Sequence, residues 1–206
     1  KLTEIDLSIE EIEKGEFPYF MLKEIHDQQH SIKDTMRGRL NFEDGITTLG
    51  GIADFIPNLL SASRIYITAC GTSWHAGLIG KHLIEDYAKL PVHVEYASEF
   101  RYRNAIIDSN TVLIAISQSG ETADTLAAME TAKQKNCFQV VICNQVGTQA
   151  TRMADRSLFI NAGQEIGVAA TKTFTNTLVC LYLFAASLGH QKGVLSDNQI
   201  DSLVKE

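Results

Sequence analysis

From residue 64 onward, short apolar runs alternate with stretches of helical periodicity, and this alternation limits the folds open to the chain. Five runs are rich in β-branched and aromatic residues: 64–69, 92–96, 111–116, 139–143 and 157–160. Stretches with apolar residues at helical spacing lie between and after them: 74–89, 121–134, 148–153 and 174–188. Strands that alternate with helices indicate βαβ units, in which the strands run parallel. The runs are apolar along most of their length, as expected for strands covered on both faces.

We therefore predict an α/β fold with three layers: a doubly wound, five-stranded parallel sheet of the flavodoxin-like type, with helices on both faces. Three further helices are predicted: 19–40, 52–60 and 196–204, the last with Ser196 as N-cap. Apolar positions such as Ile25 and Ile32 recur at loosely helical spacing in the first of them. The stretch 174–188 is almost wholly apolar, so we expect it to be buried on most sides.

The polar, acidic residues 1–18 end in Gly15-Glu16-Phe17-Pro18 and are predicted to form a linker or arm. Residues 19–206 then form one domain, a length that can bury a substantial core. Because the chain opens on Lys1 rather than Met, we expect it to be a piece of a longer protein.

The balance of charges argues against two classes of partner. The 18 Lys and Arg residues are outnumbered by 25 Asp and Glu, which gives a net charge of −7 at pH 7. Nucleic acids and anionic membrane surfaces both call for a cationic face, so we predict that the chain binds neither. No apolar run approaches the roughly 18 residues of a membrane helix and no signal peptide opens the chain, so we expect a cytoplasmic protein.

Four cysteines are spread along the chain: Cys70, Cys137, Cys143 and Cys180. No C-x-x-C spacing occurs, and Cys143 and Cys180 lie in apolar runs, so both are predicted to be small buried side chains in a reducing compartment. Cys70 could be a reactive thiol, but the sequence shows no base near it.

Two pairs of histidines stand at helical spacing: His26 with His30, and His75 with His82. Neither pair has a third ligand, and the first lacks the glutamate of an H-E-x-x-H motif. We expect all four to be solvated, and we predict neither a metal site nor a cofactor.

In a doubly wound sheet, ligands bind at the carboxyl ends of the strands, so the loops that follow strands carry the most information. Gly71, Thr72 and Ser73 follow the run 64–69 and precede a helix. Gly71 permits a tight turn, and either hydroxyl can cap the helix or face a bound anion. Taken alone, a cap accounts for this loop.

The loop after 111–116 is richer in hydroxyls, with Ser117, Gln118, Ser119, Gly120, Glu121 and Thr122 in succession. A cap needs only one hydroxyl, and three are present. Hydroxyls at the N-terminus of a helix suit a phosphate monoester, because O–H groups, N–H groups and the helix dipole converge on it. The loop matches neither the nucleotide motifs G-x-x-x-x-G-K-[ST] and G-x-G-x-x-G nor the nucleophile elbow G-x-S-x-G.

A third segment, 165–175, is rich in small residues that would let a ligand approach the backbone. Lys172 could contact a phosphate or form a Schiff base. We expect it instead to be solvated or paired with Glu165.

Four stretches together resemble the SIS (sugar isomerase) family: EKGEFPYFMLKEIHDQQ, ACGTSWHAG, ISQSGETADTLAA and EIGVAATKTFTNT. Within it, they are similar to the first SIS domain of the glucosamine-6-phosphate synthases, the isomerising glutamine–fructose-6-phosphate aminotransferases. The resemblance covers essentially the whole chain. It implies a domain that binds fructose 6-phosphate or glucose 6-phosphate, in an enzyme that uses glutamine to make glucosamine 6-phosphate for amino-sugar nucleotide biosynthesis.

The resemblance also implies which residues bind the sugar phosphate: Thr72, Ser73, Ser117, Gln118, Ser119 and Thr122, with a backbone contact near Val168. It assigns no catalytic residue to this chain, since the family's catalytic Glu, His and Lys lie in a second SIS domain and the tail after it. The partners it implies are an upstream glutaminase domain, that second SIS domain and a second copy in a homodimer. The apolar stretch 174–188 and the arm also suggest self-association. Trp74 and Ala170 depart from the usual family residues.

Two alternatives stay open on the sequence. A stand-alone sugar-phosphate isomerase would need its own acid or base, for which Glu165 and His75 are the candidates. A sugar-phosphate sensor domain of a transcription regulator would need a basic helix-turn-helix upstream, and the acidic residues 1–18 give no sign of one.

Overall fold

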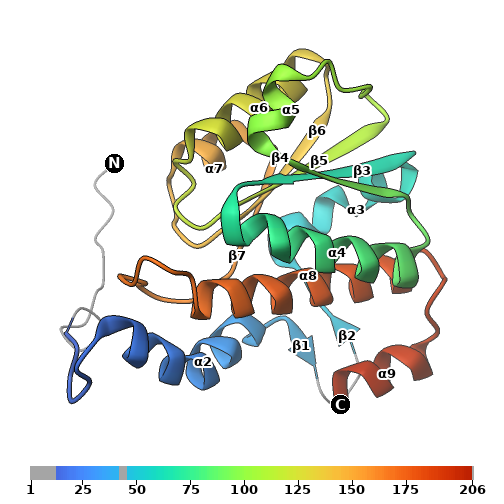
Figure 1. Cartoon of the computed structure of the whole chain (residues 1–206). Coiled ribbons are helices and arrows are strands. Elements are labelled where there is room, and N and C mark those ends of the chain that lie inside the picture. The colour runs from blue at the N-terminus through green and yellow to red at the C-terminus, as the bar shows by residue number, and fades with distance from the viewer. Residues whose placement is uncertain (1–12, 42–45, 206) are drawn as a thin grey trace.

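A five-stranded parallel sheet lies at the centre of the protein (Figure 1). The computed structural model describes residues 13–41 and 46–205. The strands are β3 (Arg64–Ala69), β4 (Val92–Tyr96), β5 (Thr111–Ser117), β6 (Phe138–Cys143) and β7 (Arg156–Phe159). They are ordered β4-β3-β5-β6-β7, and every neighbouring pair is parallel. This confirms the predicted flavodoxin-like sheet, with each strand bounded within one residue of its predicted limits.

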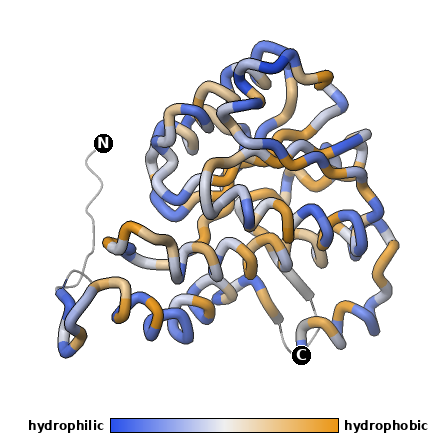
Figure 2. Tube along the Cα trace, in the orientation of Figure 1, coloured by the Kyte–Doolittle hydropathy of each residue, from blue (hydrophilic) through white to orange (hydrophobic). Residues whose placement is uncertain are grey.

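Helices cover both faces of the sheet (Figure 1). One face carries η1 (Gly50–Phe55), α3 (Ile56–Ser61), α4 (Gly71–Ala88) and α8 (Lys172–Gln191). The other carries α5 (Ala97–Tyr102), α6 (Ala123–Gln134) and α7 (Gln149–Met153). A hydrophobic core lies on each face of the sheet, and alternate strand residues point into one or the other. Ile65 and Ile67 pack toward α4 and α8, and Tyr66 packs toward α5 and α6. The central strands β5 and β6 are buried along almost their whole length, and hydrophobic colour is concentrated in the interior of the trace in Figure 2.

The strand order creates a switch point between β3 and β5. The chain leaves β3 for β4 at one edge and then returns to β5 on the other side of β3. The two strands pair in register, with Ala69 opposite Ile116. The loops that follow them therefore begin side by side and diverge, which is where doubly wound sheets bind ligands.

Helix α2 (Phe20–Met36) lies against the outer side of α8, outside the three layers (Figure 1). Its buried residues are polar: Glu24, Ser31 and Thr35. Ile25, one of the apolar positions at helical spacing, is instead 43% exposed. The reason is the partner surface, because α8 presents the buried amide of Asn176 to this helix.

Several boundaries differ from expectation. Helix α4 begins three residues earlier than predicted, at Gly71, and α9 spans Asp197–Lys205. Ser196 precedes α9, and its hydroxyl contacts the Gln199 side chain at 2.9 Å. Helix α5 and the two-stranded sheet of β1 (Leu40–Asn41) and β2 (Ile46–Thr47) were not predicted.

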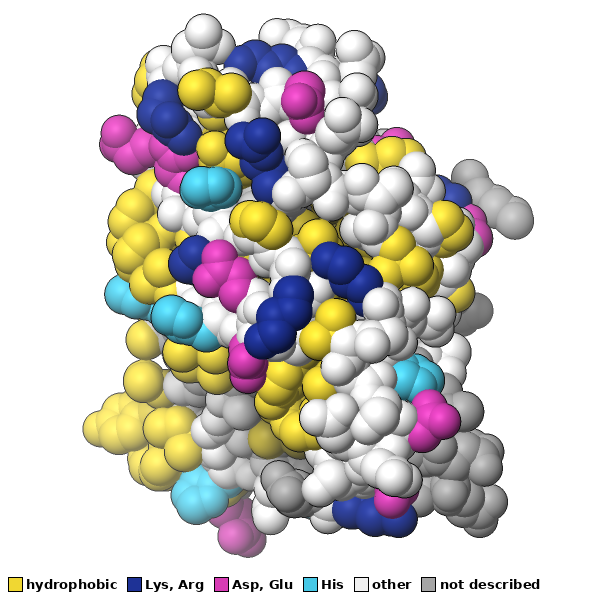
Figure 3. All heavy atoms as spheres, turned by 90° about the vertical axis from the view of Figure 1, so that its right-hand side faces the viewer, with side chains coloured by type: hydrophobic (Ala, Val, Ile, Leu, Met, Phe, Trp, Pro, Cys, Tyr) yellow, Lys and Arg dark blue, Asp and Glu magenta, His cyan; other side chains and the backbone are white. Residues whose placement is uncertain are grey.

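Residues 1–12 of the predicted arm lie outside the described residues. Residues 13–18 hold neither a helix nor a strand, and their role as a linker stays a prediction. Among the described helices, none is long and apolar enough to cross a membrane. The face of the molecule in Figure 3 intersperses Lys and Arg with Asp and Glu side chains.

Candidate functional site

The loop after β3 presents two hydroxyls at the start of α4. Gly71 has a φ of 55°, in the left-handed region, and allows the chain to turn directly from strand to helix. The N-cap position falls on Cys70, whose side chain makes no capping bond. Thr72 and Ser73 therefore lie in the first helical turn, and the expectation that one of them caps the helix was wrong. Their hydroxyls make no hydrogen bond to another described residue, which leaves both available to a ligand.

The loop after β5 is shaped by its own hydroxyls. The buried Oγ of Ser117 accepts a hydrogen bond from the Gly120 N–H at 3.0 Å and lies 3.1 Å from Thr122 Oγ1. The Oγ of Ser119 accepts one from the Glu121 N–H at 3.2 Å. Ser117 thus holds the turn from within, while Gln118, Ser119 and Thr122 are half-buried at its surface.

Helix α7 fixes this loop from the side. The Ala150 N–H donates to the Gly120 carbonyl at 3.0 Å, and the Gln149 N–H donates to the Glu121 carboxylate at 2.7 Å. Gly120 has a φ of 66°, and a Cβ there would lie 2.2 Å from Thr148 Oγ1. Glycine is therefore required on two counts, backbone conformation and space, and the hydroxyl loop is held rigidly at the end of β5.

Glu165 caps the start of α8. Its carboxylate accepts hydrogen bonds from the Thr171 N–H at 3.0 Å, the Thr171 hydroxyl at 3.2 Å and the Thr173 N–H at 3.2 Å. The Thr173 hydroxyl donates to its other oxygen. A carboxylate in this position satisfies the free N–H groups of the helix end and complements the helix dipole.

Lys172 does not pair with Glu165, so that expectation was wrong. The side chain is buried, with 6% of the residue exposed, and its Nζ lies 3.4 Å from Asp27 Oδ2 on α2. A buried ammonium needs an opposite charge, and Asp27 supplies it because α2 packs directly on α8.

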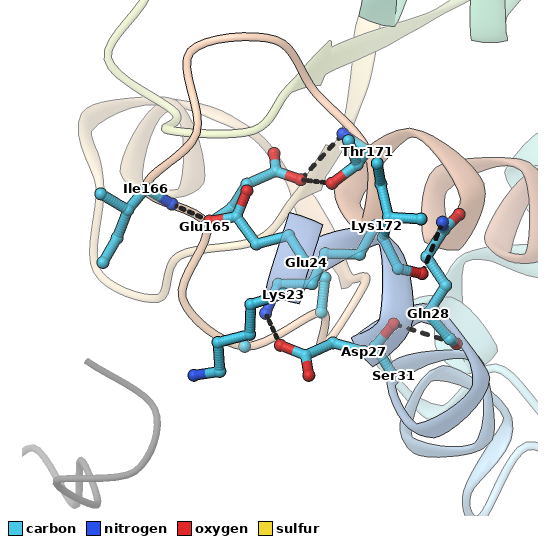
Figure 4. Close-up of polar contacts among 12 residues, drawn as sticks. Lys23, Glu24, Asp27, Gln28, Ser31, Glu165, Ile166, Thr171 and Lys172 are labelled. Carbon is cyan, nitrogen blue, oxygen red and sulfur yellow. Dashed lines mark hydrogen bonds and ion pairs between the residues drawn. The ribbon is translucent and has the colours of Figure 1, made fainter. Parts of the chain in front are cut away.

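A buried carboxylate that sequence reasoning missed is Glu24 on α2 (Figure 4). Its carboxylate is buried and accepts hydrogen bonds from the N–H groups of Ile166 at 2.5 Å and Gly167 at 3.0 Å. It thereby holds the backbone next to Val168, whose side chain is fully exposed. The sequence showed only that Glu24 is one of several polar residues in an expected helix. Its partners lie some 140 residues away and leave no local trace.

All three segments meet the carboxyl edge of the sheet. Helices α4 and α8 pack side by side and both begin at this edge (Figure 1). Asn144, just after β6, joins the third segment to it, because its side chain donates to the Gly163 carbonyl at 2.8 Å and accepts from the Ala162 N–H at 2.9 Å. The predicted site residues are therefore gathered at one end of the molecule.

The other chemistry-bearing side chains are placed as predicted. Cys143 and Cys180 are buried, and burial raises the pKa of the Cys180 thiol to about 11. Cys70 is half-buried and lies 3.9 Å from Thr125 Oγ1. The four helix histidines are exposed: His26, His30, His75 and His82. The part of the chain that the structure describes contains no group of three or more His, Cys, Asp or Glu side chains that could hold a metal ion.

Comparisons with known proteins agree on one family. The family model for the SIS domain matches residues 58–187. The chain is 50% identical over 206 residues to the glutamine–fructose-6-phosphate aminotransferases (isomerizing) of Bacteroides thetaiotaomicron and Chlorobaculum tepidum, and covers 34% and 33% of those proteins. It therefore spans about a third of the length of the curated relatives it matches.

A solved structure shows the same architecture. The C-terminal domain of the glucosamine-fructose-6-phosphate aminotransferase of Francisella tularensis superposes with a TM-score of 0.88 at 38% sequence identity. The match covers 94% of this chain and 54% of that one.

Proposed function

The chain belongs to the SIS domain family, and from that premise we propose that it is the sugar-phosphate-binding part of an isomerising glutamine–fructose-6-phosphate aminotransferase. The observation that carries the proposal is the cluster of hydroxyls at the N-termini of α4 and α6, on either side of the switch point. The relatives named above support the choice of reaction.

The phosphate lies between the two helix N-termini. Each supplies unpaired backbone N–H groups and the positive end of a dipole, and Thr72, Ser73, Ser119 and Thr122 supply O–H donors. No Lys or Arg is needed, which reconciles anion binding with a net charge of −7.

One carboxylate stands in the first turn of α6, where a phosphate would meet it. This is Asp124, and Arg101 of α5 pairs with it at 2.8 Å. The pairing offsets the negative charge of Asp124, so the N-terminus of α6 keeps its attraction for an anion.

The sugar ring or open chain of fructose 6-phosphate or glucose 6-phosphate extends from the phosphate toward the third segment. Val168 is fully exposed there, and its backbone is free to meet the sugar. Gln118 lies between the hydroxyls of the β5 loop and is placed to contact the sugar or the phosphate. We assign no catalytic residue to this chain.

The stand-alone isomerase is less well supported than this reading. It would use Glu165 or His75 to move a proton. Both oxygens of Glu165 are engaged by Thr171 and Thr173 at the cap of α8, and His75 is exposed on α4. No observation favours the sensor domain of a transcription regulator.

We further propose that the rest of the longer protein supplies a glutaminase domain and a second SIS domain, and that the protein is a cytoplasmic homodimer. The stretch 174–188 does not itself support self-association, because α4 and α2 cover α8. Exposed apolar side chains that support a dimer instead lie along α2: Met21, Leu22 and Ile25.

Removing a single hydroxyl tests the assignment of the phosphate site. Ser119→Ala and Thr122→Ala should each weaken binding of fructose 6-phosphate by about ten- to a hundredfold, since a hydrogen bond to a charged group contributes roughly 1.5–3 kcal/mol. Titration calorimetry measures the affinity. Thr131→Ala is the matched control, because Thr131 lies near the opposite end of α6 and, among the described residues, its hydroxyl donates only to the Ala127 carbonyl. Unchanged affinity in both site variants would place the phosphate elsewhere.

A further inference from the structure

We propose that Glu24 is a positioning residue for the sugar: it fixes the backbone of the segment that carries Val168, without touching the ligand. The proposal rests on the proposed function of the site. It concerns a side chain on α2, a helix outside the sheet and its covering layers.

Glu24 is 2% exposed, and among the described residues its carboxylate accepts hydrogen bonds from backbone N–H groups. One oxygen accepts from Ile166 and Gly167, and the other lies 3.2 Å from the Gly167 N–H. A buried carboxylate is costly unless such charge-assisted bonds compensate it, so the helix and the segment are held together strongly at this point.

The fit at Gly167 is close. A Cβ on Gly167 would lie 2.5 Å from Glu24 Oε2 and 3.5 Å from the Met21 Cα. The backbone of Gly167 is not in the left-handed region, so glycine is needed here for space and not for conformation. The Glu24 carboxylate therefore packs directly against the Gly167 backbone, with no Cβ between them.

The segment has little else to hold its middle. Ile166 is 43% exposed and the Val168 side chain is fully exposed, so neither is anchored in the core. Glu165 holds the far end, at Thr171 and Thr173. Without Glu24, the backbone next to Val168 would lose the hydrogen bonds that hold it in place. The sugar would then have to order this backbone on binding, which lowers the affinity.

A purely structural role for Glu24, anchoring α2 to the domain, makes a different prediction. Ser31 provides the control, since it is also buried on α2 but bonds α8 instead of the segment, through Asn176 Oδ1 at 2.9 Å. If Glu24 only anchors α2, then Glu24→Ala and Ser31→Ala should act alike on the sugar site.

The test measures two quantities in the 206-residue chain: amide hydrogen exchange at Ile166 and Gly167 without ligand, and fructose 6-phosphate affinity by calorimetry. We expect Glu24→Ala to remove protection at both amides and weaken affinity by about tenfold. Glu24→Gln, which keeps one accepting oxygen, should fall between Glu24→Ala and the unaltered chain. Ser31→Ala should lower stability while leaving both readouts unchanged.

A double-mutant cycle tests the contact itself. Gly167→Ala should weaken affinity in the unaltered chain, because the new methyl group displaces the carboxylate. It should have little further effect in the Glu24→Ala background, where that space is empty. If Gly167→Ala and Glu24→Ala affect the affinity in a strictly additive way, the proposed contact between Glu24 and Gly167 is contradicted.

The outcomes separate this proposal from the function it rests on. Loss of protection in Glu24→Ala with unchanged affinity would overturn the positioning role while leaving the sugar site in place. Equal loss of affinity in Glu24→Ala and Ser31→Ala would also overturn it, in favour of general anchoring. If the unaltered chain does not bind fructose 6-phosphate at all, the proposed function fails, and the positioning role for a sugar fails with it.

Discussion

At the residue scale, two glycines and a set of hydroxyls build the site. Gly71 and Gly120 take left-handed backbone conformations at the two strand-to-helix turns, and so bring helix N-termini directly to the ends of β3 and β5. The hydroxyl of Ser117 accepts a hydrogen bond from the Gly120 N–H and so stabilises the second turn. The sequence predicted that the second turn binds a ligand, because its hydroxyls exceed what capping needs. It could not show which hydroxyls bond the turn itself, since that depends on side-chain direction.

Gly120→Ala tests the close packing of the second turn. The left-handed φ costs about 1–2 kcal/mol for a residue with a Cβ, and the clash with Thr148 adds a strain of about 1–3 kcal/mol, so urea unfolding should show a loss of about 2–5 kcal/mol. Gly147→Ala is the control: its φ is 75° with no atom within 4 Å of the new Cβ, so it should lose only the first 1–2 kcal/mol. Equal losses of unfolding free energy in Gly120→Ala and Gly147→Ala would mean that Thr148 leaves room for a Cβ at position 120.

At the element scale, the polar contact between α2 and α8 is the least expected part of the fold. Asn176 is fully buried, and its side-chain amide donates to the Ser31 carbonyl at 2.9 Å and to Thr35 Oγ1 at 2.7 Å. Polar residues on one face of a helix ordinarily face water, so a buried polar face on α2 is unusual. The two helices are more than 130 residues apart, so no local pattern signals the pairing.

Asn176→Ala should lower the free energy of unfolding by about 1–3 kcal/mol, because it removes the buried amide that donates to the Ser31 carbonyl and to the Thr35 hydroxyl. Chemical denaturation measures this. Asn104→Ala is the matched control, since that exposed amide accepts from Lys135 at 2.8 Å and its loss should change stability by less than about 0.5 kcal/mol. A stability loss no greater than that of the control would show that the polar contact does not hold α2 in place.

At the scale of the whole molecule, the sheet has a carboxyl edge, where we propose that the sugar phosphate binds, and an opposite edge. The sheet order was predictable, since alternating strands and helices leave few arrangements with right-handed crossovers. The position of α2 outside the sheet was not, because long-range polar contacts fix it. At the opposite edge, the far end of α4 and the C-terminal helix α9 form a groove of about 400 Å³. Its lining residues include Asp86, Tyr87, Lys89 and Leu195.

The most direct test of the account is to locate bound fructose 6-phosphate by amide chemical-shift changes in an isotope-labelled chain. The account predicts that titration shifts the amides of residues 71–73, 117–122 and 166–168, and leaves those that line the groove between α4 and α9 unchanged. Shifts confined to that groove, or no shifts at ligand concentrations that saturate ordinary sugar-phosphate sites, would contradict the claim that the hydroxyl loops at the switch point bind the sugar phosphate.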